Sequence, residues 1–146
     1  MNTDIRRLLE GVSDGSVSID DALLKLKIKP FEDIGYAKVD THRKLRQGTA
    51  EVIYGAGKTP GQIIGIIESM LKNGQNTILI TRLAEEAAAV VGEAYSINYH
   101  KDARCGILGQ MPVPDGTGKI VVATGGTSDI PVAEEAAQTA EYFGTA

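Results

Sequence analysis

The chain has 146 residues, of which 42% are hydrophobic and 23% are charged, and it contains no Trp. This composition is typical of a soluble globular protein of one domain or slightly more. The formal charge of −4 at pH 7 gives no support to a nucleic-acid binder, and no apolar run reaches the length of a membrane span. One cysteine, Cys105, excludes an internal disulfide, so we expect a cytoplasmic location.

Residues 1–34 predict a helical hairpin. Apolar residues recur at helical spacing in its first helix: Ile5, Leu8, Leu9 and Val12. A turn at residues 14–16 follows, and Ser18 opens a second helix with Asp21 three residues later as its capping partner. Pro30 ends that helix. The apolar faces of the two helices can pair with each other or with a partner.

Residues 35–110 alternate short strand and helix patterns, which is typical of a small α/β domain. Thr59 caps a strong helix, because Pro60 stands at its first position and Gln62 completes the capping box. The buried stripe of that helix comprises Ile63, Ile66, Ile67, Met70 and Leu71. A second helix is expected near residues 84–94. Strands are expected at residues 37–40, 51–54, 77–81, 96–99 and 105–108.

The last part of the chain predicts the start of a second α/β domain. Residues 111–118 contain two Pro and two Gly and form the best linker candidate. Residues 119–146 are expected to form the start of this domain. Residues 119–124 predict a buried strand, and a helix with an alanine face follows it. A parallel strand needs a crossover and a returning strand, and none follows. We therefore expect the chain to be a fragment, or a truncated product, of a larger enzyme.

The turn from Gly125 to Asp129 (GGTSD) lies between this strand and this helix. Backbone N–H groups and the helix dipole favour an anion at such a position. Gly125 and Gly126 permit close approach of the backbone, the hydroxyls of Thr127 and Ser128 can donate to phosphate, and Asp129 can accept from a ribose hydroxyl. On geometry alone, a helix N-cap made by Ser128 or Asp129 is the more common arrangement.

Three segments together resemble known families. The segment from Gly125 to Ala136 resembles the first loop of aminoimidazole ribonucleotide carboxylase-like (PurE-like) domains, whose Gly-Ser-x-Ser-Asp pattern holds the phosphate and ribose of a nucleotide. Gly126 replaces the first serine of that pattern, which weighs against the purine substrate. Residues 35–48 and 51–60 are similar to the N-terminal domain of the carboxylase/hydrolase that begins assembly of the nickel-pincer nucleotide cofactor of lactate racemase. The resemblance runs through essentially the whole chain, in that family's order.

The resemblance to the nickel-pincer family implies a reaction on nicotinic acid adenine dinucleotide. CO₂ is added to the pyridine ring as co-substrate, and the phosphoanhydride is cleaved to give a pyridinium biscarboxylate mononucleotide and AMP. In that family a cysteine from the later part of the PurE-like domain attacks the ring. That part lies beyond residue 146, so the catalytic residue is unknown here and we expect this chain alone to be inactive. The family further implies a homo-oligomeric parent, leaves room for Mg²⁺, and gives no sign of a tightly bound cofactor.

Other segments give weaker indications of a binding site. His42, Arg43 and Arg46 could meet a phosphate or carboxylate. A solvated charged face is the more common explanation of such a charge run, and Asp40 and Glu51 could equally pair these charges. The segment 55–59 (GAGKT) lacks the upstream glycine of a Walker loop. His42 and His100 have no companion ligands, so no metal site is predicted.

Two rival hypotheses remain open. Within enzymes, the chain could belong to an aminoimidazole ribonucleotide carboxylase of purine biosynthesis. In another class, the first 110 or so residues could be a stand-alone, non-catalytic binding or assembly module, with an unfolded tail.

Overall fold

The computed structural model describes residues 3–27, 32–40, 43, 49–111, 113–114 and 118–145. The chain divides into two units, Met1–Glu51 and Val52–Ala146. In the first unit, α1 (Thr3–Ser13) and α2 (Ile19–Lys27) form the hairpin that the sequence predicts. Its second helix begins as expected, since the Asp21 N–H donates to Ser18 Oγ over 3.0 Å. The first unit also contains β1 (Glu32–Asp33), which pairs antiparallel with β2 (Lys38–Val39).

The second unit is built on a four-stranded mixed sheet in the order β3-β4-β6-β5. β3 (Val52–Tyr54) and β4 (Ile78–Thr81) are parallel and are joined through α4 (Pro60–Lys72). β6 (Cys105–Leu108) pairs antiparallel with β4 and with β5 (Ile97–His100), which lies at the other edge. The predicted α/β class is confirmed, and the strands coincide with the predicted runs.

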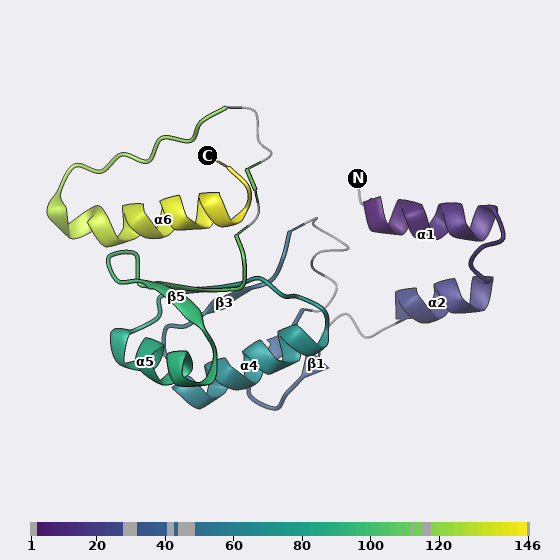
Figure 1. The fold of residues 1–146 in the computed structure, drawn as a ribbon, viewed down its shortest axis with the longest axis horizontal. Helices are drawn as coiled ribbons and strands as arrows, with labels where there is room; N and C mark the ends of the chain where they lie inside the picture. Colours follow the sequence, from purple (N-terminus) through teal and green to yellow (C-terminus); the bar gives the residue numbers. More distant parts are fainter. Residues whose placement is uncertain are drawn as a thin grey trace. The chain divides into compact units, whose positions relative to one another are not determined.

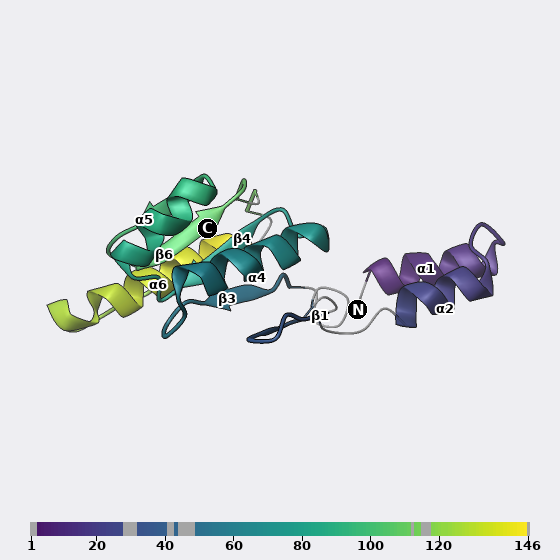
Figure 2. The same ribbon diagram turned by 90° about the horizontal axis from the view of Figure 1, so that it is seen from below.

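Helices cover both faces of this sheet (Figures 1 and 2). α4 and α5 (Glu85–Ala94) pack together on one face, and α6 (Ile130–Tyr142) lies on the other. The core between these layers is mostly apolar, with Ser69 of α4 as a buried polar residue, and burial of apolar surface is the main source of stability in such a unit. Its most completely buried side chains are Ile63, Ile67, Met70, Ile78, Leu79, Ile80, Leu83, Val91 and Cys105.

The helix α4 begins as the sequence predicts. The Gln62 N–H donates to Thr59 Oγ1, and the Thr59 N–H donates to the Gln62 side chain, so both halves of the capping box are present.

Among the helices of the described segments, none combines the length and the apolarity that crossing a bilayer requires. The predicted domain boundaries at residues 34 and 110 and the cytoplasmic location stay predictions.

The strand predicted at residues 119–124 is wrong. These residues form no ladder, and Ile120 and Val121 are 56% and 85% exposed. Their β-branched apolar composition favours a strand, but a strand needs a neighbour to satisfy its backbone N–H and C=O groups. No strand of the described residues lies beside them. The helix that follows is nevertheless formed, because it packs on the sheet of the second unit.

Candidate functional site

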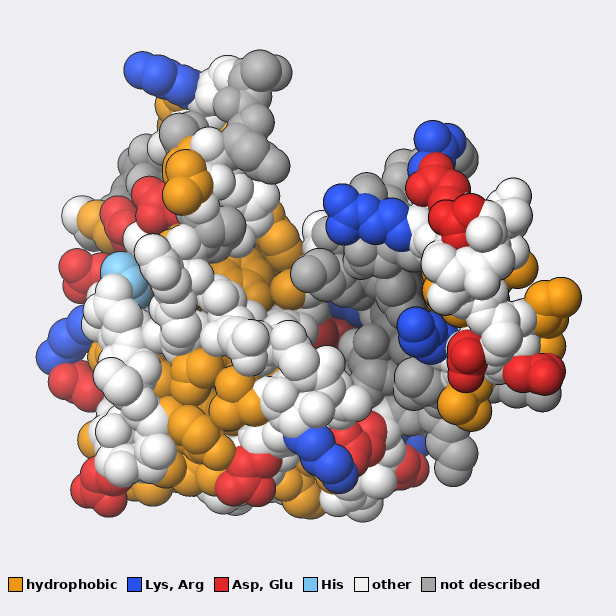
Figure 3. Space-filling view, turned by 45° about the vertical axis from the view of Figure 1, so that its right-hand side comes forward, with side chains coloured by type: hydrophobic (Ala, Val, Ile, Leu, Met, Phe, Trp, Pro, Cys, Tyr) orange, Lys and Arg blue, Asp and Glu red, His pale blue; other side chains and the backbone are white. Residues whose placement is uncertain are grey.

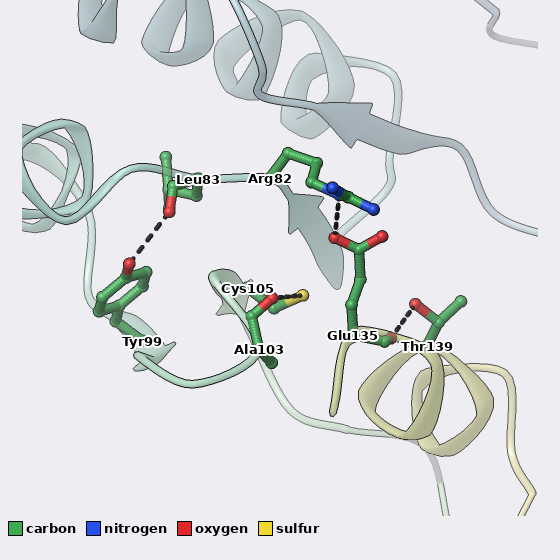
Figure 4. Close-up of polar contacts among 7 residues, drawn as sticks. All are labelled: Arg82, Leu83, Tyr99, Ala103, Cys105, Glu135 and Thr139. Atoms are coloured by element: carbon green, nitrogen blue, oxygen red, sulfur yellow. Dashed lines mark hydrogen bonds and ion pairs between the residues drawn. The ribbon is translucent and has the colours of Figure 1, made fainter. Parts of the chain in front are cut away.

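Two polar contacts fix the direction of α6 across the sheet. Near the helix C-terminus, the buried Tyr142 donates its hydroxyl to the Thr77 carbonyl over 2.9 Å, just before β4 begins. In the middle of the helix, Glu135 Oε2 lies 2.6 Å from Arg82 Nε, just after β4 ends (Figure 4). α6 therefore runs antiparallel to β4, and its N-terminus extends past the carboxyl ends of the parallel strands.

That N-terminus holds the predicted nucleotide loop. Thr127–Asp129 form a short 3-10 turn that leads into α6, and Gly125, Gly126 and the turn are all exposed. The only side-chain hydrogen bond in this loop is donated by Thr124 Oγ1 to the Gly126 carbonyl over 3.2 Å, among the residues that the structure describes. The predicted loop residues thus lie together at one end of one helix.

The alternative explanation of the loop, an ordinary N-cap, is not formed. Neither Ser128 nor Asp129 makes a side-chain capping bond at the start of α6. The helix α4 offers a contrast within the same unit, because its first turn is closed by the Thr59–Gln62 box. The start of α6 therefore presents the positive end of its dipole without a capping side chain, while the Ile130 N–H donates to the Thr127 carbonyl and Pro131 has no N–H.

A second glycine-containing loop lies at the same edge of the sheet. It connects the carboxyl end of β3 to α4, and the Gly55 N–H donates to the Thr81 carbonyl over 2.7 Å. A Cβ on Gly55 would come within 2.9 Å of that carbonyl oxygen, so this contact requires glycine. Gly57 has a φ of +74° and turns the chain toward Thr59. Lys58 is the cation of this loop.

Cys105 lies beneath the contact between α6 and the sheet (Figure 4). Its side chain is fully buried, as its apolar strand predicts, and its thiol donates to the Ala103 carbonyl over 3.4 Å. Burial raises the pKa of Cys105 from 9.0 to about 11, with a further increase from the Glu135 carboxylate and an opposing effect of Arg82. A thiol with this pKa is protonated at neutral pH and is a poor nucleophile.

The predicted basic group is described only in part. His42 and Arg46 lie outside the described residues. Arg43 forms an ion pair with Glu51, with 3.4 Å between Nη1 and Oε1, so the pairing explanation applies to that residue. The Nε2 of His100 contacts the Asn98 side-chain amide over 3.1 Å. Within the described ranges, His, Cys, Asp and Glu do not gather into a group of three that could hold a metal ion.

Sequence reasoning missed Arg82. Its φ of +51° lies in the left-handed region, as does the φ of +50° of Arg104, whose carbonyl accepts from the Leu83 N–H over 2.8 Å. A glycine or asparagine would have indicated such a conformation, but an arginine gives no signal. Its ionic partner, Glu135, is far away in the sequence, so only the fold brings them together.

Comparison with known proteins bears on this arrangement. The LarB/PurE-like N-terminal domain matches residues 31–110, which is more than half of the chain. The chain belongs to this family. It is therefore related to carboxylases, as the resemblance of its motifs implies. The match covers the β1–β2 pair, the four-stranded sheet, α4 and α5, and it ends before the loop at residues 125–129.

One relative extends over nearly the whole chain. It is an uncharacterized protein of Methanocaldococcus jannaschii, 34% identical over 151 residues. The alignment covers 99% of this chain but 59% of the relative, so the chain spans about three fifths of the relative's length. The α6 segment and its loop thus lie within a region that this archaeal protein shares.

Proposed function

We propose that the chain supplies the nucleotide-holding loop of a carboxylase/hydrolase that acts on nicotinic acid adenine dinucleotide. In this proposal the whole protein adds CO₂ to the pyridine ring, cleaves the phosphoanhydride to release AMP, and so starts nickel-pincer cofactor synthesis. The family membership supports the carboxylase class. The observation that carries the proposal is the uncapped, exposed turn Gly125–Asp129 at the start of α6.

The chemistry of the turn fits a phosphate and a ribose. The positive end of the helix dipole attracts a phosphate, and the hydroxyls of Thr127 and Ser128 can donate to its oxygens. The carboxylate of Asp129 accepts from a ribose hydroxyl. Gly125 and Gly126 leave room for the ligand beside the backbone. None of the three polar side chains has to break a bond within the described structure to do so.

The thiol that activates the pyridine ring would come from outside these 146 residues. Cys105 is unsuited to that role, because it is buried and its pKa is raised to about 11. Mg²⁺ beside the phosphates and a homo-oligomeric whole protein belong to the same proposal. Aminoimidazole ribonucleotide remains a second candidate substrate, since Ser128 and Asp129 match the purine enzyme's pattern.

Calorimetric titration of the chain with each of the two nucleotides tests the proposal. We expect the dinucleotide to bind and Ser128→Ala to weaken it about tenfold or more, since a hydrogen bond to a charged group contributes about 1.5–3 kcal/mol. Ser13→Ala is the matched control, because Ser13 is exposed on α1 in the other unit. Tighter binding of aminoimidazole ribonucleotide would favour the second candidate, and equal affinities of the Ser128→Ala and Ser13→Ala variants would refute the site.

A further inference from the structure

The two glycines of the loop before α6 are not required by the backbone. Neither Gly125 nor Gly126 has a φ in the left-handed region, and Gly126 is extended, with a φ of −160° and a ψ of 160°. Beyond the adjoining residues, a Cβ on Gly125 would meet nothing within 4 Å. A Cβ on Gly126 would come no closer than 3.9 Å to the protein, at Ser128 Oγ. Other residue types therefore fit both positions without strain.

The β3–α4 loop shows what the fold itself requires of a glycine. Gly55 is required by its contact with the Thr81 carbonyl, where a Cβ would stand at 2.9 Å, and Gly57 by its φ of +74°. Where another residue fits the same conformation, glycine destabilises a protein because it leaves the unfolded chain more freedom. The fold does not explain the glycine at position 126, whereas a ligand that lies against its Cα beside the Ser128 hydroxyl does.

The charges of this segment favour a phosphate of low charge. From Ile120 to Ala146 the sequence contains acidic residues, including Asp129 inside the loop, but no Lys or Arg. Arg82 approaches α6 but is paired with Glu135 in the middle of the helix. On the face drawn in Figure 3, the Lys and Arg side chains of the described residues are scattered among acidic ones. The helix dipole is then the main positive element at the loop, and it equals only about half an elementary charge.

We infer that Gly126 makes this loop selective for a phosphate substituted on two sides, as in a dinucleotide, over a terminal phosphate monoester. This selectivity rests on the proposed function. A monoester carries a charge of about −1.5 to −2 at pH 7 and has three terminal oxygens to satisfy. Each phosphate inside a dinucleotide carries a single charge and two free oxygens, which the hydroxyls of Thr127 and Ser128 match. The open space beside Gly126 admits the second substituent.

The same preference separates substrate from product. Hydrolysis of the phosphoanhydride by water turns the phosphate in the loop into a monoester, which adds negative charge and removes the second substituent. The loop contains the Asp129 carboxylate and no cation, so it holds the product less tightly than the substrate and favours its release.

Calorimetric titrations of the chain with nicotinic acid adenine dinucleotide and with its monoester half, nicotinic acid mononucleotide, test the selectivity. The unmodified chain should bind the dinucleotide about tenfold more tightly or better. Gly126→Ala should weaken dinucleotide binding about tenfold or more, because the methyl group fills the space of the second substituent, and should change mononucleotide binding by less than about twofold. Gly126→Ser should bind the mononucleotide more tightly than Gly126→Ala does, since its hydroxyl supplies a third donor.

Gly92→Ala is the matched control, because Gly92 is exposed in α5 and its Cβ would also meet nothing within 4 Å. It should bind both nucleotides like the unmodified chain. Thermal unfolding should show that Gly126→Ala is at least as stable as the unmodified chain, so that a loss of affinity does not reflect unfolding. If the unmodified chain binds the dinucleotide and both Gly126 variants keep its preference, this inference is overturned and the proposed function stands. If the unmodified chain does not bind the dinucleotide, both fail.

Discussion

The Arg82 guanidinium lies 2.6 Å from the Glu135 carboxylate and joins the end of β4 to the middle of α6. Arg82 reaches this position from a left-handed backbone conformation, with a φ of +51°. The pair holds α6 antiparallel to β4, and the loop at residues 125–129 is thereby carried past the carboxyl ends of β3 and β4. The position of the proposed nucleotide site thus depends on this nonlocal ion pair together with the bond from Tyr142 to the Thr77 carbonyl at the other end of α6.

Glu135→Gln should loosen α6 while leaving the sheet intact. The pair is partly exposed, at 43% for the Arg82 side chain and 20% for the Glu135 side chain, so its loss should lower the free energy of unfolding by about 0.5–1 kcal/mol. Hydrogen exchange should speed up in α6 more than in β4 or β6. The matched control is Glu134→Gln, one residue earlier on the exposed side of the helix. Equal exchange in both variants would contradict the docking role.

Tyr142→Phe should weaken the other end of α6. Tyr142 is 4% exposed, and its hydroxyl donates to the Thr77 carbonyl over 2.9 Å. Removing the hydroxyl should lower the free energy of unfolding by about 1 kcal/mol in urea denaturation. Tyr54→Phe is the control, because Tyr54 is 59% exposed. If both variants unfolded at the same urea concentration, the Tyr142 bond would contribute nothing.

The stability of the second unit should fall at alkaline pH because of Cys105. Its pKa is about 11 in the folded chain and 9.0 in its ordinary state. Between these values the folded thiol keeps its proton while the unfolded thiol loses it, so this contribution to stability is complete below pH 9 and is lost as the pH rises to about 11. Thermal unfolding of the unmodified chain and of Cys105→Ala should therefore converge over this range. A difference that stayed constant would contradict the raised pKa.

Two glycine substitutions around α4 should have opposite effects. Gly55→Ala forces a Cβ to within 2.9 Å of the Thr81 carbonyl and should lower the free energy of unfolding by about 1–3 kcal/mol. Gly61→Ala lies in the first turn of α4, where the added Cβ meets nothing within 4 Å, and should raise it by up to about 1 kcal/mol. Chemical denaturation measures both. A loss of stability in both variants would show that the Gly55 contact is not specific.

Local sequence signals predicted most of the second unit. The capping box of Thr59 and Gln62, the strands of the sheet and the helix 130–142 follow from residues close together in the chain. The prediction failed at residues 119–124, where strand propensity is strong but no neighbouring strand is present to pair with it. Propensity describes what a segment favours, whereas a ladder needs two segments.

Only part of the candidate site could be predicted from the sequence. The residues of the loop from Gly125 to Asp129 could be chosen from their chemistry, because glycines, hydroxyls and a carboxylate before a helix are a local pattern. The absence of a side-chain cap at α6 could not be predicted, since Ser128 and Asp129 are both common capping residues. The Arg82–Glu135 pair was equally hidden, because the fold alone brings the two residues together.

The most direct measurement is an amide chemical-shift titration of the chain with nicotinic acid adenine dinucleotide. The central claim is that the uncapped N-terminus of α6 binds the nucleotide, so the amides of Gly126, Thr127, Ser128 and Asp129 should shift on saturation. The amides of Gly61 and Gln62, in the capped first turn of α4, provide the internal control and should shift little. Shifts confined to α4, or no shifts at saturating dinucleotide, would contradict the claim.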